Sequence, residues 1–164
     1  MKNQLLALLL LDGFIVSSCS KSDDTKERLM GDRWLVEAMI LSTDFGDPSV
    51  DIEEDILHEL FLPAIPCQAQ HKAYYFDFKN DDLIAQTIEC DGELFLGGDA
   101  PYEIREDGTK LFIGSSDSDT QPQEMANTEY DIVRHTDTEL HLRNVTESTQ
   151  FPIHRIILEY RLRR

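Results

Sequence analysis

The sequence predicts a mainly β fold in a single domain, built as an antiparallel sandwich or barrel. The chain of 164 residues, 41% of them hydrophobic, is long enough to bury a core but too short for a (β/α)₈ barrel, which needs about 250 residues. Short runs with aromatic and β-branched residues recur along it. Turn dipeptides such as Asp91-Gly92 and Asp107-Gly108 separate these runs, a pattern typical of β-hairpins.

Eight or nine strands are expected. In chain order they cover residues 34–41, 73–78, 83–89, 93–96, 102–105, 110–113, 129–135, 139–145 and 153–162. In the second of them Tyr74, Phe76 and Phe78 alternate with other residues, which places all three aromatic rings on one face of the strand. The polar turn 79–82 then predicts a hairpin with the strand that follows.

One helix is expected over residues 51–61. Apolar residues recur there at three- and four-residue spacing, which is the period of an amphipathic helix. Pro63 and Pro66 follow directly and would end it before Cys67.

The N-terminus has the layout of a secretory signal. Lys2 supplies a positive charge, and a largely apolar run from Leu5 to Val16 follows, interrupted by Asp12 and Gly13. The run is shorter than the roughly 20 apolar residues of a membrane-spanning helix. We therefore expect a cleaved signal rather than a permanent transmembrane helix.

The end of that segment, Val16-Ser17-Ser18-Cys19, resembles the lipobox of bacterial lipoproteins. The resemblance implies cleavage before Cys19, followed by its acylation with a diacylglycerol thioether and an amide-linked fatty acid such as palmitate. The next residues, Ser20 to Asp24, resemble the acidic surface-export signal of Bacteroidota lipoproteins. Together they imply a protein anchored by lipid to the outer membrane, on its periplasmic face or at the cell surface. An ordinary secretory signal that ends near a cysteine is the alternative.

Three segments follow from this interpretation. Residues 1–18 are the signal peptide, residues 19–28 a lipidated polar tether, and residues 29–164 the folded domain. Of the three cysteines, acylation of Cys19 leaves Cys67 and Cys90, which can pair in an oxidising compartment. That disulfide would contribute about 3 kcal/mol in the chain-entropy model. Two separate buried thiols are the alternative.

The start of the domain, Gly31-Asp32-Arg33-Trp34, resembles the glycine and tryptophan opening of lipocalin-like proteins. In that family the glycine enters the first strand and the tryptophan plugs the closed end of the barrel. Lipocalin-like Bacteroidota lipoproteins also carry one cysteine before an aromatic strand and another after the next strand, as Cys67 and Cys90 do here. The resemblance implies an antiparallel eight-stranded barrel with one short helix.

Composition and motifs exclude several classes of function. With 15 basic and 32 acidic residues the formal net charge is −17, which argues against nucleic acid as a partner. Phosphate-binding loops, nucleophile elbows and dinucleotide fingerprints are missing from the sequence. Asp117-Ser118-Asp119 lacks the rest of a calcium loop, and adjacent carboxylates such as Glu53-Glu54 and Asp81-Asp82 are expected on a solvated face. We therefore expect no enzyme, catalytic residue or cofactor, and hold a carboxylate-based envelope hydrolase as remote.

The histidines give no metal site either. His135 and His141 could approach each other across a hairpin that turns near Asp137, and they are the one pair worth testing. A zinc site normally needs three or four ligands, so exposed histidines without a metal are expected.

Two functions remain open. Trp34, Tyr74, Phe76 and Phe78 would line the cavity of a carrier for a small apolar ligand, or else fill a dry core. In the second case the barrel is an interaction or envelope-assembly module with a protein partner, recognised by loops such as Ser115 to Asn127.

Overall fold

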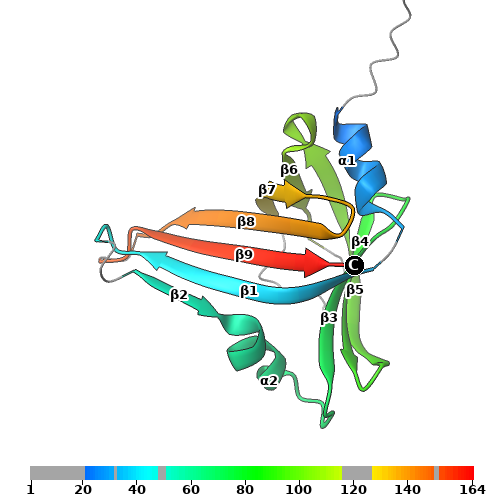
Figure 1. The fold of residues 1–164 in the computed structure, drawn as a ribbon, viewed down its shortest axis with the longest axis horizontal. Coiled ribbons are helices and arrows are strands. Elements are labelled where there is room, and N and C mark those ends of the chain that lie inside the picture. Colours follow the sequence, from blue (N-terminus) through cyan, green and yellow to red (C-terminus); the bar gives the residue numbers. More distant parts are fainter. Residues whose placement is uncertain (1–20, 32, 48–50, 116–126, 150–151) are drawn as a thin grey trace, which may run out of the picture.

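The computed structural model shows a closed eight-stranded antiparallel barrel (Figure 1). It describes residues 21–31, 33–47, 51–115, 127–149 and 152–164. The strands are β1 (Trp34–Asp44), β2 (Ile52–Asp55), β3 (Lys72–Phe78), β4 (Leu83–Cys90), β5 (Glu93–Arg105), β6 (Lys110–Ile113), β7 (Thr128–His135), β8 (Glu139–Glu147) and β9 (Arg155–Arg163). The helical segments are α1 (Lys21–Leu29), a π-helical turn η1 (Leu57–Phe61), α2 (Leu62–Ala64) and a 3₁₀ turn η2 (Glu106–Gly108). The predicted fold class is confirmed.

Pairing between the first and last strands closes the barrel. β1 pairs with β9 from Leu35↔Arg163 to Asp44↔Arg155, and a bulge interrupts the register between Val36 and Ala38. On its other side β1 pairs with β3 only at Trp34 and Leu35, and with β2 farther along. Among the described strands β2 pairs with β1 alone, so it lies outside the ring of eight.

The segment after β2 covers the seam where β1 and β3 part. Leu57 and Leu62 are buried there. The Nζ of Lys72 donates to the carbonyl oxygens of Leu62 and Ile65, at 3.1 and 2.7 Å. The predicted disulfide is confirmed between Cys67 and Cys90, so it ties the end of this segment to β4.

Inward-facing positions alternate along the strands and meet in one core. Tyr74, Phe76 and Phe78 do share the inner face of β3, as predicted, and each is at most 2% exposed. Tyr102, Tyr130 and Tyr160 come from strands across the barrel. The core is therefore rich in aromatic rings, which bury more apolar surface per residue than other side chains.

We define the closed end of the barrel by the turns 79–82, 106–108 and 136–138, where the C-terminus also lies. The indole Nε1 of Trp34 donates to the carbonyl oxygen of Leu29 at 2.9 Å, and the Arg164 guanidinium stacks over the indole at 4.3 Å. Trp34 thus seals this end, as the resemblance implied. The opposite end, with the turns 91–92 and 148–154, is called the open end.

The predicted polar tether is in part a helix packed on the barrel. Residues 21–29 form α1, which lies across the closed end beside the β5–β6 turn (Figure 1). Asp23 and Asp24 in its first turn and Arg28 in its last match the helix dipole. Leu29 is fully buried, so apolar contact fixes the C-terminal end of the helix to the barrel.

Two sequence predictions were wrong in detail. The expected helix 51–61 begins as strand β2, because the unpaired edge of β1 recruits it, and helical structure starts only at Leu57. The Asp55 carboxylate accepts from the amide of Leu57 at 3.0 Å, which favours the switch at that point. The strands expected at residues 93–96 and 102–105 are one continuous strand, β5, which stays paired with β4 through Gly97 and Gly98.

Candidate functional site

The four aromatic residues predicted to line a ligand cavity lie inside the barrel but at different depths. Trp34 is at the closed end, 6.2 Å from the His135 ring. Tyr74 lies toward the open end, in edge contact with Phe76 at 5.2 Å and tilted against Phe61 at 5.1 Å. Phe78 packs in edge contact on Tyr102 at 5.2 Å. All four side chains are buried, so they act as core in this structure.

A continuous aromatic layer crosses the barrel above the closed end. Phe76 lies 5.7 Å from Tyr160, and Tyr160 lies 5.9 Å from Tyr130, measured between ring centroids. These rings come from β3, β9 and β7, so they span the interior from wall to wall. A ligand would therefore lie on the open-end side of this layer.

One buried polar side chain interrupts the apolar interior. Gln86 faces inward on β4, is 2% exposed, and its Oε1 accepts from the Tyr74 hydroxyl at 2.8 Å. Its Nε2 has no hydrogen-bond partner among the described residues. Gln86 was not among the predicted site residues, although its position two residues from both Ile84 and Ile88 was a signal that it faces the core.

Past the aromatic layer, β1, β8 and β9 continue side by side toward the open end (Figure 1). Their register puts Leu41, Leu158 and Asn144 on the same face as Met39, Tyr160 and Leu142, which belong to the core. One step farther, Ile156 has the same orientation and is 36% exposed. The inner face thus changes from core to accessible apolar surface along these strands.

The wall of the barrel splits where β7 and β8 separate. Their pairing ends at Asp131↔Arg143, after which β7 stays with β6 and β8 stays with β9. A hollow of about 570 Å³ opens at the split. The inward-facing residues that line it are Thr128, Tyr130, Asn144, Thr146 and Leu158, and outward-facing residues such as Lys110, Asp131 and Arg143 form its rim. It therefore connects the outside with the open-end side of the aromatic layer.

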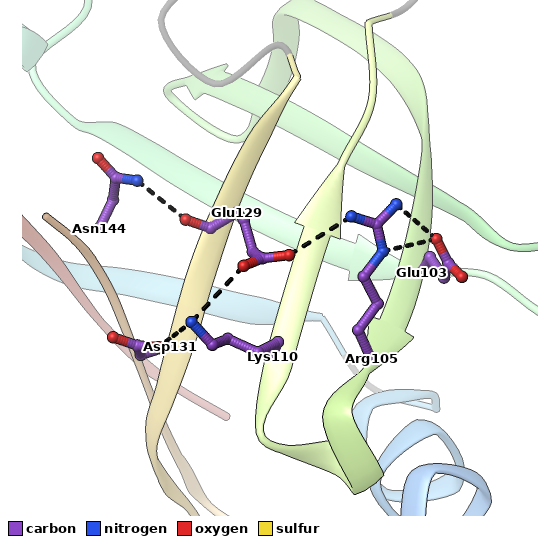
Figure 2. A network of polar contacts seen from close by, with 6 residues as sticks. All are labelled: Glu103, Arg105, Lys110, Glu129, Asp131 and Asn144. Atoms are coloured by element: carbon purple, nitrogen blue, oxygen red, sulfur yellow. Dashed lines mark hydrogen bonds and ion pairs between the residues drawn. The ribbon is translucent and has the colours of Figure 1, made fainter. Parts of the chain in front are cut away.

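A network of polar contacts borders this hollow (Figure 2). The Nδ2 of Asn144 donates to the carbonyl oxygen of Glu129 at 2.9 Å, across the gap between β8 and β7. Lys110 Nζ lies 2.8 Å from the Asp131 carboxylate and 3.5 Å from that of Glu129. The hydrogen bond to Asp131 raises the pKa of Lys110, so its charge is fixed and paired at neutral pH.

The same network continues along the outer wall. The Arg105 guanidinium contacts Glu103 at 2.7 Å and Glu129 at 3.4 Å. It also stacks over the Phe112 ring at 4.0 Å. Exposed ion pairs of this kind contribute about 0.2–1 kcal/mol each, so the network positions the strands more than it stabilises the fold.

The two histidines considered as a pair do not converge. In the β7–β8 hairpin His135 is opposite Leu140, and His141 is opposite Arg134. His135 therefore faces Trp34 at the closed end, whereas His141 faces outward, 3.9 Å from Glu159. His135 and His141 are both only partly exposed, so the expectation of exposed histidines was wrong for these two. Within the described ranges, no three His, Cys, Asp or Glu residues are grouped as a metal site would require.

The adjacent carboxylates lie apart from the hollow. Glu53 and Glu54 are exposed neighbours on β2 and so point to opposite faces. Asp82 lies in the β3–β4 turn and forms an ion pair with Lys26 of α1.

A second, shallow hollow of about 1260 Å³ covers the outer face of β3, β4 and β5. Its floor is formed by small residues, Ala85, Thr87 and Gly97. A Cβ on Gly97 would meet Thr87 Cγ2 at 3.2 Å, so glycine keeps the neighbouring strand close. Leu94 at its edge is 69% exposed.

Several predicted features lie outside the described residues. They are the signal peptide, the lipidation site Cys19, the motif Asp117-Ser118-Asp119 and residues 116–126 of the expected recognition loop. No helix in the described part of the chain is long and apolar enough to cross a bilayer.

No family model, no curated protein and no solved structure matches this chain. The closed antiparallel barrel is compatible with a lipocalin-like ligand-binding domain.

Proposed function

We propose that this protein is a lipid-anchored envelope lipoprotein whose lipocalin-like barrel binds a small apolar ligand without transforming it. The anchor is Cys19, supported by the resemblance of residues 16–19 to a lipobox. The location is the outer membrane, supported by the acidic residues that follow that cysteine. Two acyl attachments would hold the protein firmly, because each buried methylene contributes about 0.8 kcal/mol.

The observation that carries the ligand proposal is the hollow between β7 and β8. Its volume of about 570 Å³ falls within the range of about 300–1,000 Å³ that is usual for small-molecule sites. Tyr130 and Leu158 line it and join it to the aromatic core. An apolar ligand placed there would cover Leu158 and reach the exposed Ile156 beyond it.

The charges around the hollow restrict what it accepts. Lys110 is paired with Asp131, and Arg143 is paired with Glu159 at 3.0 Å. A charged headgroup would have to compete with these pairs. Asn144 and Thr146 also face the hollow and offer uncharged hydrogen-bonding groups. Most of the lining residues are polar, so the apolar part of a ligand would rest on Tyr130, Val145 and Leu158. The favoured ligand is therefore a small apolar molecule that also carries uncharged hydrogen-bonding groups.

Native mass spectrometry of the protein after mild extraction from its membrane tests this proposal. We expect a bound small molecule that a Thr146→Trp variant loses, because the indole fills the hollow from an exposed position on its wall. Glu147→Trp is the matched control, since the neighbouring residue does not line the hollow. A ligand-free wild type, or a ligand retained equally by both variants, would refute the proposal.

A protein-interaction module is the second candidate, favoured by the hollow on β3, β4 and β5. This concave face with the exposed Leu94 at its edge is a surface that a protein partner could cover. In-cell cross-linking from Thr87→Cys would then capture one specific protein. The small molecule bound between β7 and β8 would be missing in that case.

A further inference from the structure

The N-terminal helix is held to the closed end by polar contacts that come from three separate parts of the chain. Lys26 forms an ion pair with Asp82 in the β3–β4 turn. The Thr25 hydroxyl lies 3.4 Å from the carbonyl oxygen of Gly108 in η2, to which it can donate in place of its intrahelical acceptor, the Lys21 carbonyl oxygen at 3.0 Å. At the other end of the helix the Arg164 guanidinium donates to the carbonyl oxygen of Arg28. The direction of α1 is thus fixed relative to the barrel.

The terminal part of β9 and the first residues of β1 strengthen this fixation. Arg164 also donates to the carbonyl oxygen of Met30 at 3.2 Å and stacks on Trp34. Trp34 in turn donates to the carbonyl oxygen of Leu29, which is fully buried. The segment that links α1 to β1 therefore has little freedom to let the helix swing away.

Little chain separates this helix from the proposed anchor. α1 begins at Lys21, two residues after Cys19. Two residues span at most about 7 Å even when fully extended. A lipid attached to Cys19 would therefore hold the first turn of α1, and the closed end beneath it, close to the bilayer surface.

We propose that the closed end of the barrel faces the lipid bilayer and that the open end points away from it. The partner of the closed end is the phospholipid headgroup layer, and this inference rests on the proposed acylation of Cys19. The turns at the closed end carry Asp81, Asp82, Glu106, Asp107 and Asp137. Because these acidic residues would repel anionic lipids, the orientation comes from the short covalent link rather than from charge attraction.

The orientation determines where the ligand enters. β8 runs from Glu139 near the closed end to Glu147 at the open end, and nine residues of strand span about 30 Å. The hollow between β7 and β8 lies toward the Glu147 end. A ligand would thus be exchanged on the aqueous side, well above the headgroups, rather than directly from the membrane interior.

Energy transfer to a lipid-borne acceptor dye in neutral phosphatidylcholine vesicles tests the orientation. The full-length lipidated protein is labelled at a single introduced thiol, with Thr138→Cys near one end of β8 and Glu147→Cys at its other end; both residues are exposed. We expect severalfold more transfer from the Thr138→Cys label. Equal transfer from both labels, or more from Glu147→Cys, would overturn the orientation while leaving the anchor in place.

Two further measurements separate this failure from failure of the anchor. The intact mass shows whether Cys19 carries its acyl chains, and flotation shows whether the protein binds vesicles; an unmodified, unbound protein refutes the anchor itself. A Thr25→Ala/Lys26→Ala/Arg164→Ala triple variant should remain bound but lose most of the difference between labels, because the polar side-chain contacts at both ends of α1 are removed. Glu27→Ala, an exposed change on the same helix, should keep the difference.

Discussion

Two buried tyrosine hydroxyls have opposite surroundings. The Tyr74 hydroxyl donates to Gln86 at 2.8 Å, whereas the Tyr102 hydroxyl is buried without a hydrogen-bond partner in the described part of the chain. Burial, followed by the negative charges of Asp82 and Asp81, raises the pKa of Tyr102 to about 12. The Tyr102 hydroxyl is thus both unsatisfied and held in its neutral form.

Phenylalanine at these two positions should change stability in opposite directions. Tyr102→Phe removes an unsatisfied hydroxyl and should raise the free energy of unfolding by up to about 1 kcal/mol. Tyr74→Phe removes a made hydrogen bond and should lower it by about 1 kcal/mol. Urea unfolding of both variants checks this. A loss of stability in Tyr102→Phe would show that its hydroxyl has a partner.

His135 makes stability depend on pH. Burial, followed by the charges of Arg28 and Arg164, lowers the pKa of His135 below the ordinary 6.5. The unfolded chain therefore binds this proton more readily, so the contribution to stability is complete above pH 6.5 and is lost as the pH falls below it. Burial also lowers the pKa of His141, which acts in the same direction.

Unfolding free energies measured between pH 7 and 5 should separate these contributions. His135→Gln should flatten the decline of stability in this range, because it removes the group whose pKa burial lowers. Only the slope is compared, because replacing a half-buried ring costs stability at every pH. A slope identical to that of the wild type would contradict the role of His135.

At the scale of elements, the disulfide and Lys72 together hold the segment that covers the β1–β3 seam. The segment contains little regular structure, since η1 and α2 are only five and three residues long. The disulfide that joins the end of this segment to β4 stabilises the fold mainly by lowering the conformational entropy of the unfolded chain.

A Cys67→Ala/Cys90→Ala variant should lose about 3 kcal/mol of unfolding free energy. Hydrogen exchange should quicken mainly over residues 56–71, because the seam loses its covalent tie there. Wild type treated with a reductant is the control and should show the same loss. Unchanged stability in the double variant would show that the bond adds nothing to the fold.

The elements also show where sequence patterns suffice. The strand predicted at 110–113 has the same bounds as β6, since alternation and the Asp107-Gly108 turn both act locally. The helix predicted at 51–61 failed at its start, because the free edge of β1 is a distant feature that no local period reveals. The strands predicted at 93–96 and 102–105 join in β5 for a similar reason, because Gly97 allows the close approach of Thr87 on the neighbouring strand.

At the scale of the whole molecule, the barrel is closed at one end, and its wall separates between β7 and β8 toward the other. The closed end could be predicted from Trp34 through the family resemblance. The hollow could not, because it arises where β7 and β8 follow different partners after Asp131↔Arg143.

The most direct test of ligand binding in this barrel is a crystal structure of the protein extracted from its native membrane. The account predicts non-protein density between β7 and β8, in contact with Leu158 and Tyr130, inside a ring closed by β1 and β9. A hollow filled by the protein's own side chains, or density found only on the outer face of β3, β4 and β5, would contradict it.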